Sequence, residues 1–302
     1  MKISLRDVYS DIKNTISPQT EDAAFEAKEL LQAVFGVSRQ DILLGRETEV
    51  ESKQLDRLCE LARRRASREP LQYLLGEWDF YGRTFSVGPG VLIPRADTEP
   101  LVEKTLDFLK GKPNPRVLDL CTGSGCIAVT IGAERPDAEV WAVEKSPEAW
   151  DFFCHNNEKY GGRVHGVLAD ALADIPILPV EFDLIISNPP YLTAEEMADL
   201  QPEVQKEPAM ALDGGEDGLS FYRQLTSRYR GFLKPGGMMA YEIGMGQEHA
   251  VCEIFLQNRL DSVCQTKDLH GIIRVVTAEN KLSQSDAENQ STEVDNLWPK
   301  RK

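Results

Sequence analysis

The sequence has little of what binds metals or forms disulfides. Its six cysteines include no Cys-x-x-Cys pair, and its four histidines are scattered. Neither a zinc site nor a disulfide framework is indicated, and we expect no metal. No apolar run approaches the ~20 residues that a membrane-spanning helix needs. Residues 1–7 carry charges where a signal peptide needs an apolar core, so we expect a cytoplasmic protein with no membrane partner.

Basic residues are also scarce. Lysine and arginine number 34 against 49 aspartates and glutamates, which gives a net charge of -15 over 302 residues. Binding to nucleic-acid phosphates needs clustered Lys and Arg, so this balance argues against a broad nucleic-acid-binding face. We therefore expect no direct nucleic-acid partner. The composition is otherwise that of a globular protein, and the length suggests two domains.

The first part of the chain has a helical pattern. From Leu5 to about Arg68 apolar residues recur at intervals of three and four, and Gly36 offers a helix C-cap. Residues 1–75 are thus expected to form a helical domain without a catalytic constellation. Its basic cluster, Arg63 to Arg65 with Arg68, suggests a solvated helix end or, alternatively, a patch that docks the substrate.

Residues 76–95 change character, because short apolar runs alternate with glycine and proline, as in a β-hairpin linker. The chain then starts a helix near Pro100, with Asp97 or Thr98 as N-cap. Over residues 96–280 strands and helices alternate, which predicts an α/β fold with a doubly wound, mostly parallel seven-stranded sheet. The last two strands are too close for a helical crossover and should pair antiparallel. Residues 281–302 are polar and should be disordered.

One stretch predicts where the chemistry lies. Asn188-Pro189-Pro190-Tyr191 follows the apolar run of residues 182–186, which reads as a buried strand that ends abruptly. Ligands bind at the carboxyl ends of strands in open α/β sheets. Asn188 and the Pro189 carbonyl offer two stiffly held acceptors beside the Tyr191 ring, which suits a planar NH2 group. Accepting both hydrogens would turn the nitrogen lone pair out of conjugation and toward an electrophile such as a sulfonium methyl. A rigid turn is the alternative interpretation.

A glycine-rich loop indicates a nucleotide-like cofactor. Gly123 and Gly125 lie between the first sheet strand and its helix, and Glu144 ends the next strand. This pattern alone also fits a dinucleotide fingerprint. Asp119, however, precedes the glycines, where a carboxylate opposes a pyrophosphate and suits a cation that carries an ammonium and a sulfonium. We expect Glu144 to accept the ribose hydroxyls and Asp170 to lie near the adenine; capping roles are the alternative for Asp119 and Asp170.

Together these residues resemble the release-factor glutamine methyltransferases of the HemK type, over about residues 69–276. The similarity includes Glu69 to Gly76, Phe80-Tyr81-Gly82, Leu92 to Glu99, the glycine loop, Asn188 to Tyr191, Glu207-Pro208, Ala211 to Leu219, and Glu242-Ile243-Gly244. The sequence departs from the family pattern at Ala96, where proline is usual, Cys121, where glycine is usual, Glu144, where aspartate is common, and Ala171, where a bulkier residue is common.

The resemblance implies a class I, Rossmann-like methyltransferase. It would transfer a methyl group from S-adenosylmethionine to the side-chain amide of the glutamine in the Gly-Gly-Gln loop of class-1 peptide chain release factors. The expected catalytic residues are Asn188, Pro189, Pro190 and Tyr191. The expected cofactor-binding residues are Asp119, Cys121, Thr122, Gly123, Ser124, Gly125, Glu144, Asp170, Ala171 and Asn188.

Other activities stay open at this point. The same clamp suits an exocyclic base amine of nucleic acid, although the acidic composition opposes it. A ribosomal-protein glutamine is a second alternative substrate, although residues 94–99 favour a release factor. An NAD-dependent oxidoreductase is opposed by Asp119 and leaves Asn188 to Tyr191 unexplained. A noncatalytic binding module needs no such clamp.

Overall fold

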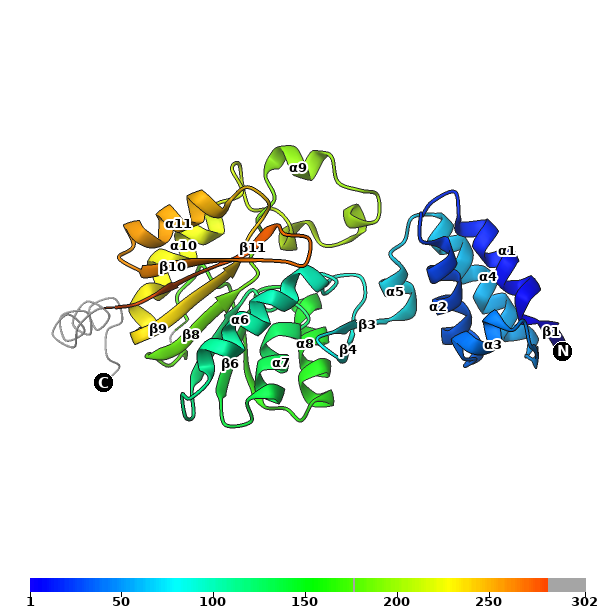
Figure 1. Cartoon of the computed structure of the whole chain (residues 1–302), viewed down its shortest axis with the longest axis horizontal. Coiled ribbons are helices and arrows are strands. Elements are labelled where there is room, and N and C mark those ends of the chain that lie inside the picture. The colour runs from blue at the N-terminus through cyan, green and yellow to red at the C-terminus, as the bar shows by residue number, and fades with distance from the viewer. Residues whose placement is uncertain (176, 282–302) are drawn as a thin grey trace. The chain divides into compact units, whose positions relative to one another are not determined.

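The computed structural model describes residues 1–175 and 177–281. The chain forms two compact units, each with its own core (Figure 1). The first comprises residues 1–78, 87–89 and 201–206, and the second comprises residues 79–86, 90–200 and 207 onward. The hairpin expected as a linker is thus divided between the units. The tail predicted to be disordered lies, from residue 282, outside the described residues.

The first unit is helical, as its periodicity indicated. Ser4 caps the first helix by accepting a hydrogen bond from the Asp7 N–H, and Gly36 ends the second at a φ of 67°. A short antiparallel pair of strands, not expected from the sequence, joins the N-terminus to the loop before the fourth helix. The elements are β1 (Lys2–Ser4), α1 (Leu5–Ile16), α2 (Ala23–Phe35), α3 (Arg39–Leu43), β2 (Glu47–Glu49), α4 (Ser52–Ala66), α5 (Leu71–Leu75) and the 3₁₀ turn η2 (Val204–Lys206).

The basic cluster at the end of α4 is mostly paired. Arg65 is 4% exposed and donates to both carboxylate oxygens of Glu26, at 2.6 and 3.0 Å, and to Oε1 of Glu203 at 3.0 Å. Arg68 donates to the same Glu203 oxygen at 3.1 Å, and Arg64 forms a two-point pair with Glu69. The prediction of a solvated helix end is therefore wrong for Arg65, which holds residues 201–206 within the first unit.

A hairpin and a helix follow α5 in the chain. Strands β3 (Glu77–Phe80) and β4 (Arg83–Ser86) pair with each other, as expected, but residues 91–93 form no strand. The 3₁₀ turn η1 (Ala96–Thr98) leads into α6 (Glu99–Leu109), whose first turn contains Pro100. Thr98 occupies the N-cap position, yet its side chain makes no capping hydrogen bond.

The predicted mostly parallel seven-stranded sheet is confirmed. Its strand order is β10-β11-β9-β8-β5-β6-β7. Neighbours from β7 to β9 run parallel, and β11 runs antiparallel to both β9 and β10, as the short connection required. The strands are β5 (Arg116–Leu120), β6 (Glu139–Glu144), β7 (Val164–Leu168), β8 (Phe182–Ser187), β9 (Leu233–Glu242), β10 (Asp261–Lys267) and β11 (Ile273–Glu279).

Helices cover both faces of this sheet (Figure 1). One face packs against α6, α7 (Cys126–Glu134) and α8 (Pro147–Lys159), and the other against α10 (Ser220–Tyr229) and α11 (Glu248–Gln257). Side chains alternate between the faces, so Leu184 and Ile186 lie on the α6 side and Ile185 on the α10 side. The remaining elements are α9 (Ala194–Ala198), η3 (Ala209–Ala211) and η4 (Arg230–Phe232).

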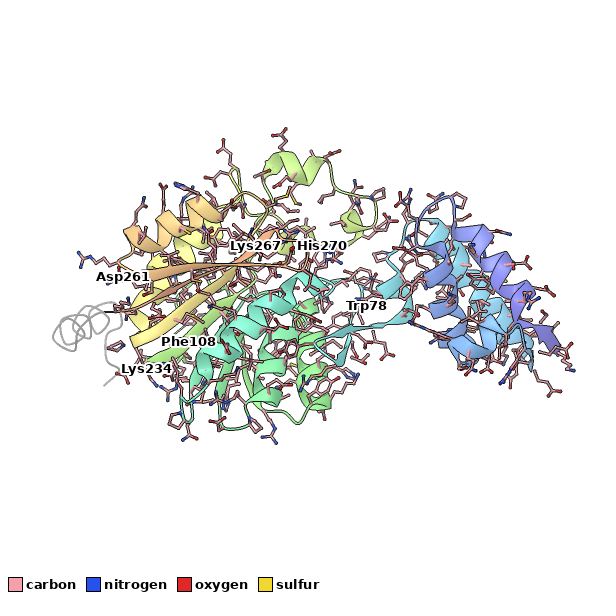
Figure 2. The ribbon with its side chains drawn as sticks, viewed as in Figure 1. Trp78, Phe108, Lys234, Asp261, Lys267 and His270 are labelled. Atoms are coloured by element: carbon pink, nitrogen blue, oxygen red, sulfur yellow. The ribbon has the colours of Figure 1, made fainter. Side chains whose placement is uncertain are left out.

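The direction of the strands fixes which edge of the sheet can carry a site. Figure 2 shows Lys234 and Asp261, near the beginnings of β9 and β10, at one end of the sheet, and Lys267 and His270 at the other. Strand β9 ends at this second edge, beside the carboxyl ends of β8 and β5. In a doubly wound sheet that is the edge at which ligands bind.

Candidate active site

The two predicted motifs meet at the carboxyl edge of the sheet. Strands β5 and β8 are parallel neighbours, and Leu120 pairs in register with Ser187. The Ser187 hydroxyl also donates to the Leu120 carbonyl at 2.6 Å, which ties the two strand ends together. The glycine loop after β5 and the Asn188 to Tyr191 stretch after β8 therefore start side by side. This is the arrangement expected for one site built from both.

The glycine loop turns sharply because three of its residues have positive φ. These angles are 61° at Cys121, 58° at Gly123 and 81° at Gly125. A Cβ added at Gly125 would lie 2.8 Å from the Phe153 ring, so that position requires glycine for space as well as for conformation. Cys121, which replaces the usual family glycine, holds the left-handed conformation at a cost of about 1 kcal/mol.

Asp119 lies behind the loop and not on the pocket wall. It is fully buried, and its Oδ2 accepts a hydrogen bond from the Thr122 hydroxyl at 2.5 Å. Its Oδ1 has no hydrogen-bond partner within the described parts of the chain. Burial, together with the charge of Glu144, raises the pKa of Asp119 to about 7. The Asp119 carboxyl group therefore stabilises the turn of the glycine loop from its buried side.

Glu144 connects the second strand end to the glycine loop. Its Oε2 accepts from the Gly123 N–H at 2.7 Å, and its Oε1 accepts from the Lys145 and Ser146 N–H groups at 2.8 and 2.7 Å. Asp170, after β7, accepts from the Leu172 N–H at 2.8 Å and pairs with the Lys145 ammonium at 2.8 Å. Both carboxylates line the pocket.

The pocket formed here has about 920 Å³ of empty space, including the part open to solvent, which is large enough for a nucleoside-sized ligand. Of the predicted site residues, nine line it and four do not: Asp119, Gly125, Pro189 and Tyr191 are absent from its wall. The nine are Cys121, Thr122, Gly123, Ser124, Glu144, Asp170, Ala171, Asn188 and Pro190.

Tyr191 is held behind the wall by contacts of its own. Its carbonyl accepts from Nε2 of Gln247 at 2.8 Å, and its hydroxyl lies 3.5 Å from Oε1 of Glu242. Burial and the charge of Glu242 raise the pKa of Tyr191 well above its usual range. Asn188 is half-buried on the wall, and its Nδ2 donates to the Thr98 hydroxyl at 3.3 Å.

Residues 90–98, for which no site role was predicted, also contact the pocket. Leu92, Ile93, Arg95 and Thr98 are among its lining residues. Glu207 holds this segment: its Oε2 accepts from the Ile93 N–H at 3.0 Å, and its Oε1 accepts from the Arg95 guanidinium. The family-like motifs around Arg95 and Glu207 could have indicated that this segment belongs to the site. Their pairing was not predictable from local sequence, because the two residues are 112 positions apart.

The fold and the site define an α/β methyltransferase. Residues 101–216 match the family model of the methyltransferase small domain, and residues 8–76 match the PrmC N-terminal domain. The fold is shared with the solved catalytic domain of hMettl16 in complex with MAT2A 3'UTR hairpin 1. That match has a TM-score of 0.57 at 14% identity and covers 88% of this chain and 93% of the other.

Relatives at much higher identity specify the family. A release factor glutamine methyltransferase of Geobacter sulfurreducens is 41% identical over 260 residues, which cover 85% of this chain and 89% of the relative. One of Gloeobacter violaceus is 40% identical, covering 84% and 90%. The chain belongs to the release factor glutamine methyltransferase family. Within the described ranges no helix is long and apolar enough to cross a membrane.

Proposed function

We propose that this enzyme transfers a methyl group from S-adenosylmethionine to the side-chain nitrogen, N5, of the glutamine in the Gly-Gly-Gln motif of class-1 peptide chain release factors. The observation that carries the proposal is the hydrogen bonding of the Asn188 side-chain amide. Its NH2 group bonds to Thr98, so its carbonyl oxygen is the part of the amide that is available to a substrate. Family membership supplies the glutamine and the release factor as the substrate class.

The pocket fits the proposed methyl donor better than a dinucleotide. Two cationic side chains are among its described lining residues, and both already bind carboxylates: Lys145 pairs with Asp170, and Arg95 pairs with Glu207. A pyrophosphate would therefore meet paired cations and the Glu144 carboxylate. S-adenosylmethionine supplies an electrophilic sulfonium methyl when bound. A cationic ligand with ribose hydroxyls suits these acidic walls.

Individual residues take different parts in holding this donor. Glu144 uses its Oε2 for one backbone N–H and keeps acceptor capacity there for a ribose hydroxyl. Asp170 and Ala171 are assigned to the adenine end. The loop residues Cys121 to Gly125 bring backbone groups close to the ligand. Asp119 acts from behind the loop, where it fixes Thr122.

The chain's contribution to the chemistry is to bind and orient the target amide. An amide nitrogen is a poor nucleophile because its lone pair is delocalised into the carbonyl. Asn188 Oδ1 and the Pro189 carbonyl accept its two hydrogens, which turns the lone pair out of conjugation and toward the cofactor pocket. Pro189 and Pro190 are buried and keep this stretch stiff. We assign docking of the release factor to the helical unit.

Methyl transfer to defined acceptors tests the proposal. The purified enzyme is incubated with radiolabelled S-adenosylmethionine and, in parallel, a release factor, the same factor with its Gly-Gly-Gln glutamine changed to alanine, a ribosomal protein, and RNA. Label on the intact factor and none on the alanine variant is the expected result. Label on RNA or ribosomal protein alone would overturn the assignment. Calorimetry should detect binding of S-adenosylmethionine and not of NAD.

A further inference from the structure

A single side-chain amide, that of Gln247, joins the chain after β8, the loop before α10 and the end of β9. Its Nε2 donates to the Tyr191 carbonyl at 2.8 Å and to the Gly218 carbonyl at 3.4 Å. Its Oε1 accepts from the Gly244 N–H at 2.9 Å and from the Tyr222 hydroxyl at 3.2 Å. Gln247 is half-buried at the N-cap of α11, and its side chain uses both of its donors and both of its acceptor positions.

The partners of this amide require two donors at one end of the side chain and an acceptor at the other. The carbonyl oxygens of Tyr191 and Gly218 can only accept, and the N–H of Gly244 can only donate. Tyr222 adds a hydroxyl proton, which it shares with the Glu242 backbone carbonyl at 3.1 Å. A carboxylate has no hydrogen for the two carbonyls, and an aliphatic side chain binds none of the partners. The partners therefore also fix which way the amide is turned.

Glycines bring these segments close enough to share one side chain. A Cβ added at Gly218 would lie 2.4 Å from the Tyr191 carbonyl oxygen and 2.5 Å from Nε2 of Gln247. One added at Gly214 would lie 2.7 Å from Cα of Tyr191, and one at Gly244 would lie 2.9 Å from Oε1 of Gln247. All three glycines belong to family-like stretches for which no role was predicted from the sequence. Close packing around one amide accounts for them.

The joined segments carry different parts of the pocket wall. Asn188 lies on the wall three residues before Tyr191, and Phe221 lies on it three residues after Gly218. Among the described residues Gln247 itself is not part of the lining. It therefore holds two parts of the wall from outside the pocket.

We infer that Gln247 is a positioning residue that holds Asn188 and the Pro189 carbonyl in the geometry required by the target amide. Before Asn188 the chain is fixed by β8, which is paired on both sides. After the two prolines it is fixed at the Tyr191 carbonyl by Gln247. The inference rests on the proposed function, because this geometry matters only if the stretch binds a substrate amide.

A positioning role predicts which kinetic quantity changes. The glycine loop and Glu144, which we assign to the cofactor, follow β5 and β6 and are held by a hydrogen bond between them. Loss of the Gln247 amide should therefore lower kcat for the release factor and leave the affinity for S-adenosylmethionine unchanged. A general loss of structure would lower both.

Substitution of Gln247 tests the role directly. Gln247→Glu keeps the shape and places a carboxylate oxygen against two carbonyls, so kcat should fall about 10- to 10²-fold, as expected for a displacement of roughly 1 Å. Gln247→Met removes the hydrogen bonds without adding repulsion and should lower kcat by a smaller factor. Gln224→Glu is the matched control, because Gln224 is exposed on α10, donates to Ser220 of its own helix and gains the same charge.

The same contact can be broken from its other side. Gly218→Ala places a Cβ against the Tyr191 carbonyl and the Gln247 amide, so kcat should again fall. Gly82→Ala is the control: Gly82 has the same φ of 69°, and an added Cβ would meet no atom within 4 Å. In the double variant Gly218→Ala with Gln247→Met the two losses should not multiply, because both act on one contact.

Circular dichroism, calorimetry with S-adenosylmethionine and single-turnover methylation of the release factor are measured for each full-length variant. Wild-type rates in Gln247→Glu and Gln247→Met would overturn the inference. Unfolding of both variants, or a parallel loss of cofactor affinity, would also overturn it, because Gln247 would then stabilise the fold in general. Absence of methyl transfer to the release factor by the wild type would instead refute the proposed function.

Discussion

The buried ion pair at the end of α4 allows a quantitative test of how the helical unit is held together. Arg65→Ala removes the partner of Glu26, which is 7% exposed and bonded to Arg65 through both oxygens. The Thr20 hydroxyl still donates to Glu26 at 3.0 Å, and Arg68 still binds Glu203. What remains is a buried carboxylate without a cation, so the free energy of unfolding should fall by about 3–5 kcal/mol.

Urea denaturation followed by circular dichroism measures this loss. Arg63→Ala, two residues away, is the matched control, because Arg63 is exposed and its Nε donates to the Cys59 carbonyl of its own helix. That variant should change stability by no more than about 0.5 kcal/mol. The pair Glu26→Leu with Arg65→Met should recover most of the loss. A loss below about 1 kcal/mol for Arg65→Ala would contradict a stabilising role of this buried ion pair.

Three further outcomes are expected. Asn188→Ala should lower the single-turnover methylation rate by roughly 10²-fold with cofactor affinity retained, and Asn188→Asp should keep more activity than Ala; a wild-type rate in Asn188→Ala would end the clamp mechanism. Cys121→Gly relieves the left-handed strain, so its melting temperature should hold or rise, whereas Cys126→Gly, within helix α7, should cost about 1 kcal/mol or more. The raised pKa of Glu242 contributes stability that is complete below about pH 4.5 and is lost as the pH rises through about 7. Glu242→Gln should therefore be more stable than wild type by up to roughly 3 kcal/mol at pH 8 and by little at pH 5. A pH-independent difference in the free energy of unfolding would contradict this.

Local patterns were enough to predict the fold and much of the pocket wall. The alternation of strands and helices predicted the sheet. The glycines predicted the loop, and Glu144 marked the end of the neighbouring strand that contacts it. Both follow from the periodicity and backbone preferences of a few adjacent residues. The rule that ligands bind at carboxyl ends of strands then brought Asn188 to the same edge.

Contacts between distant residues were not predictable in the same way. Thr98 has the sequence signature of an N-cap, yet its hydroxyl bonds to a residue 90 positions later. The pairing of Arg65 with Glu203 spans 138 positions, and nothing in the arginine cluster indicates that it is buried. Glu242 lies in a family-like motif, but the sequence predicted no role for this residue. Partners of this kind depend on how strands are ordered in the sheet, which a single sequence does not encode locally.

In the proposed mechanism, Asn188 and its neighbours present hydrogen-bond acceptors to a release-factor glutamine. Mass spectrometry of a release factor after incubation with S-adenosylmethionine and the enzyme is the decisive test of this mechanism. We expect one added methyl group on the side-chain nitrogen of the Gly-Gly-Gln glutamine, formed by the wild type and formed roughly 10²-fold more slowly by Asn188→Ala. A methyl group on any other residue, or equal rates in the two proteins, would contradict it.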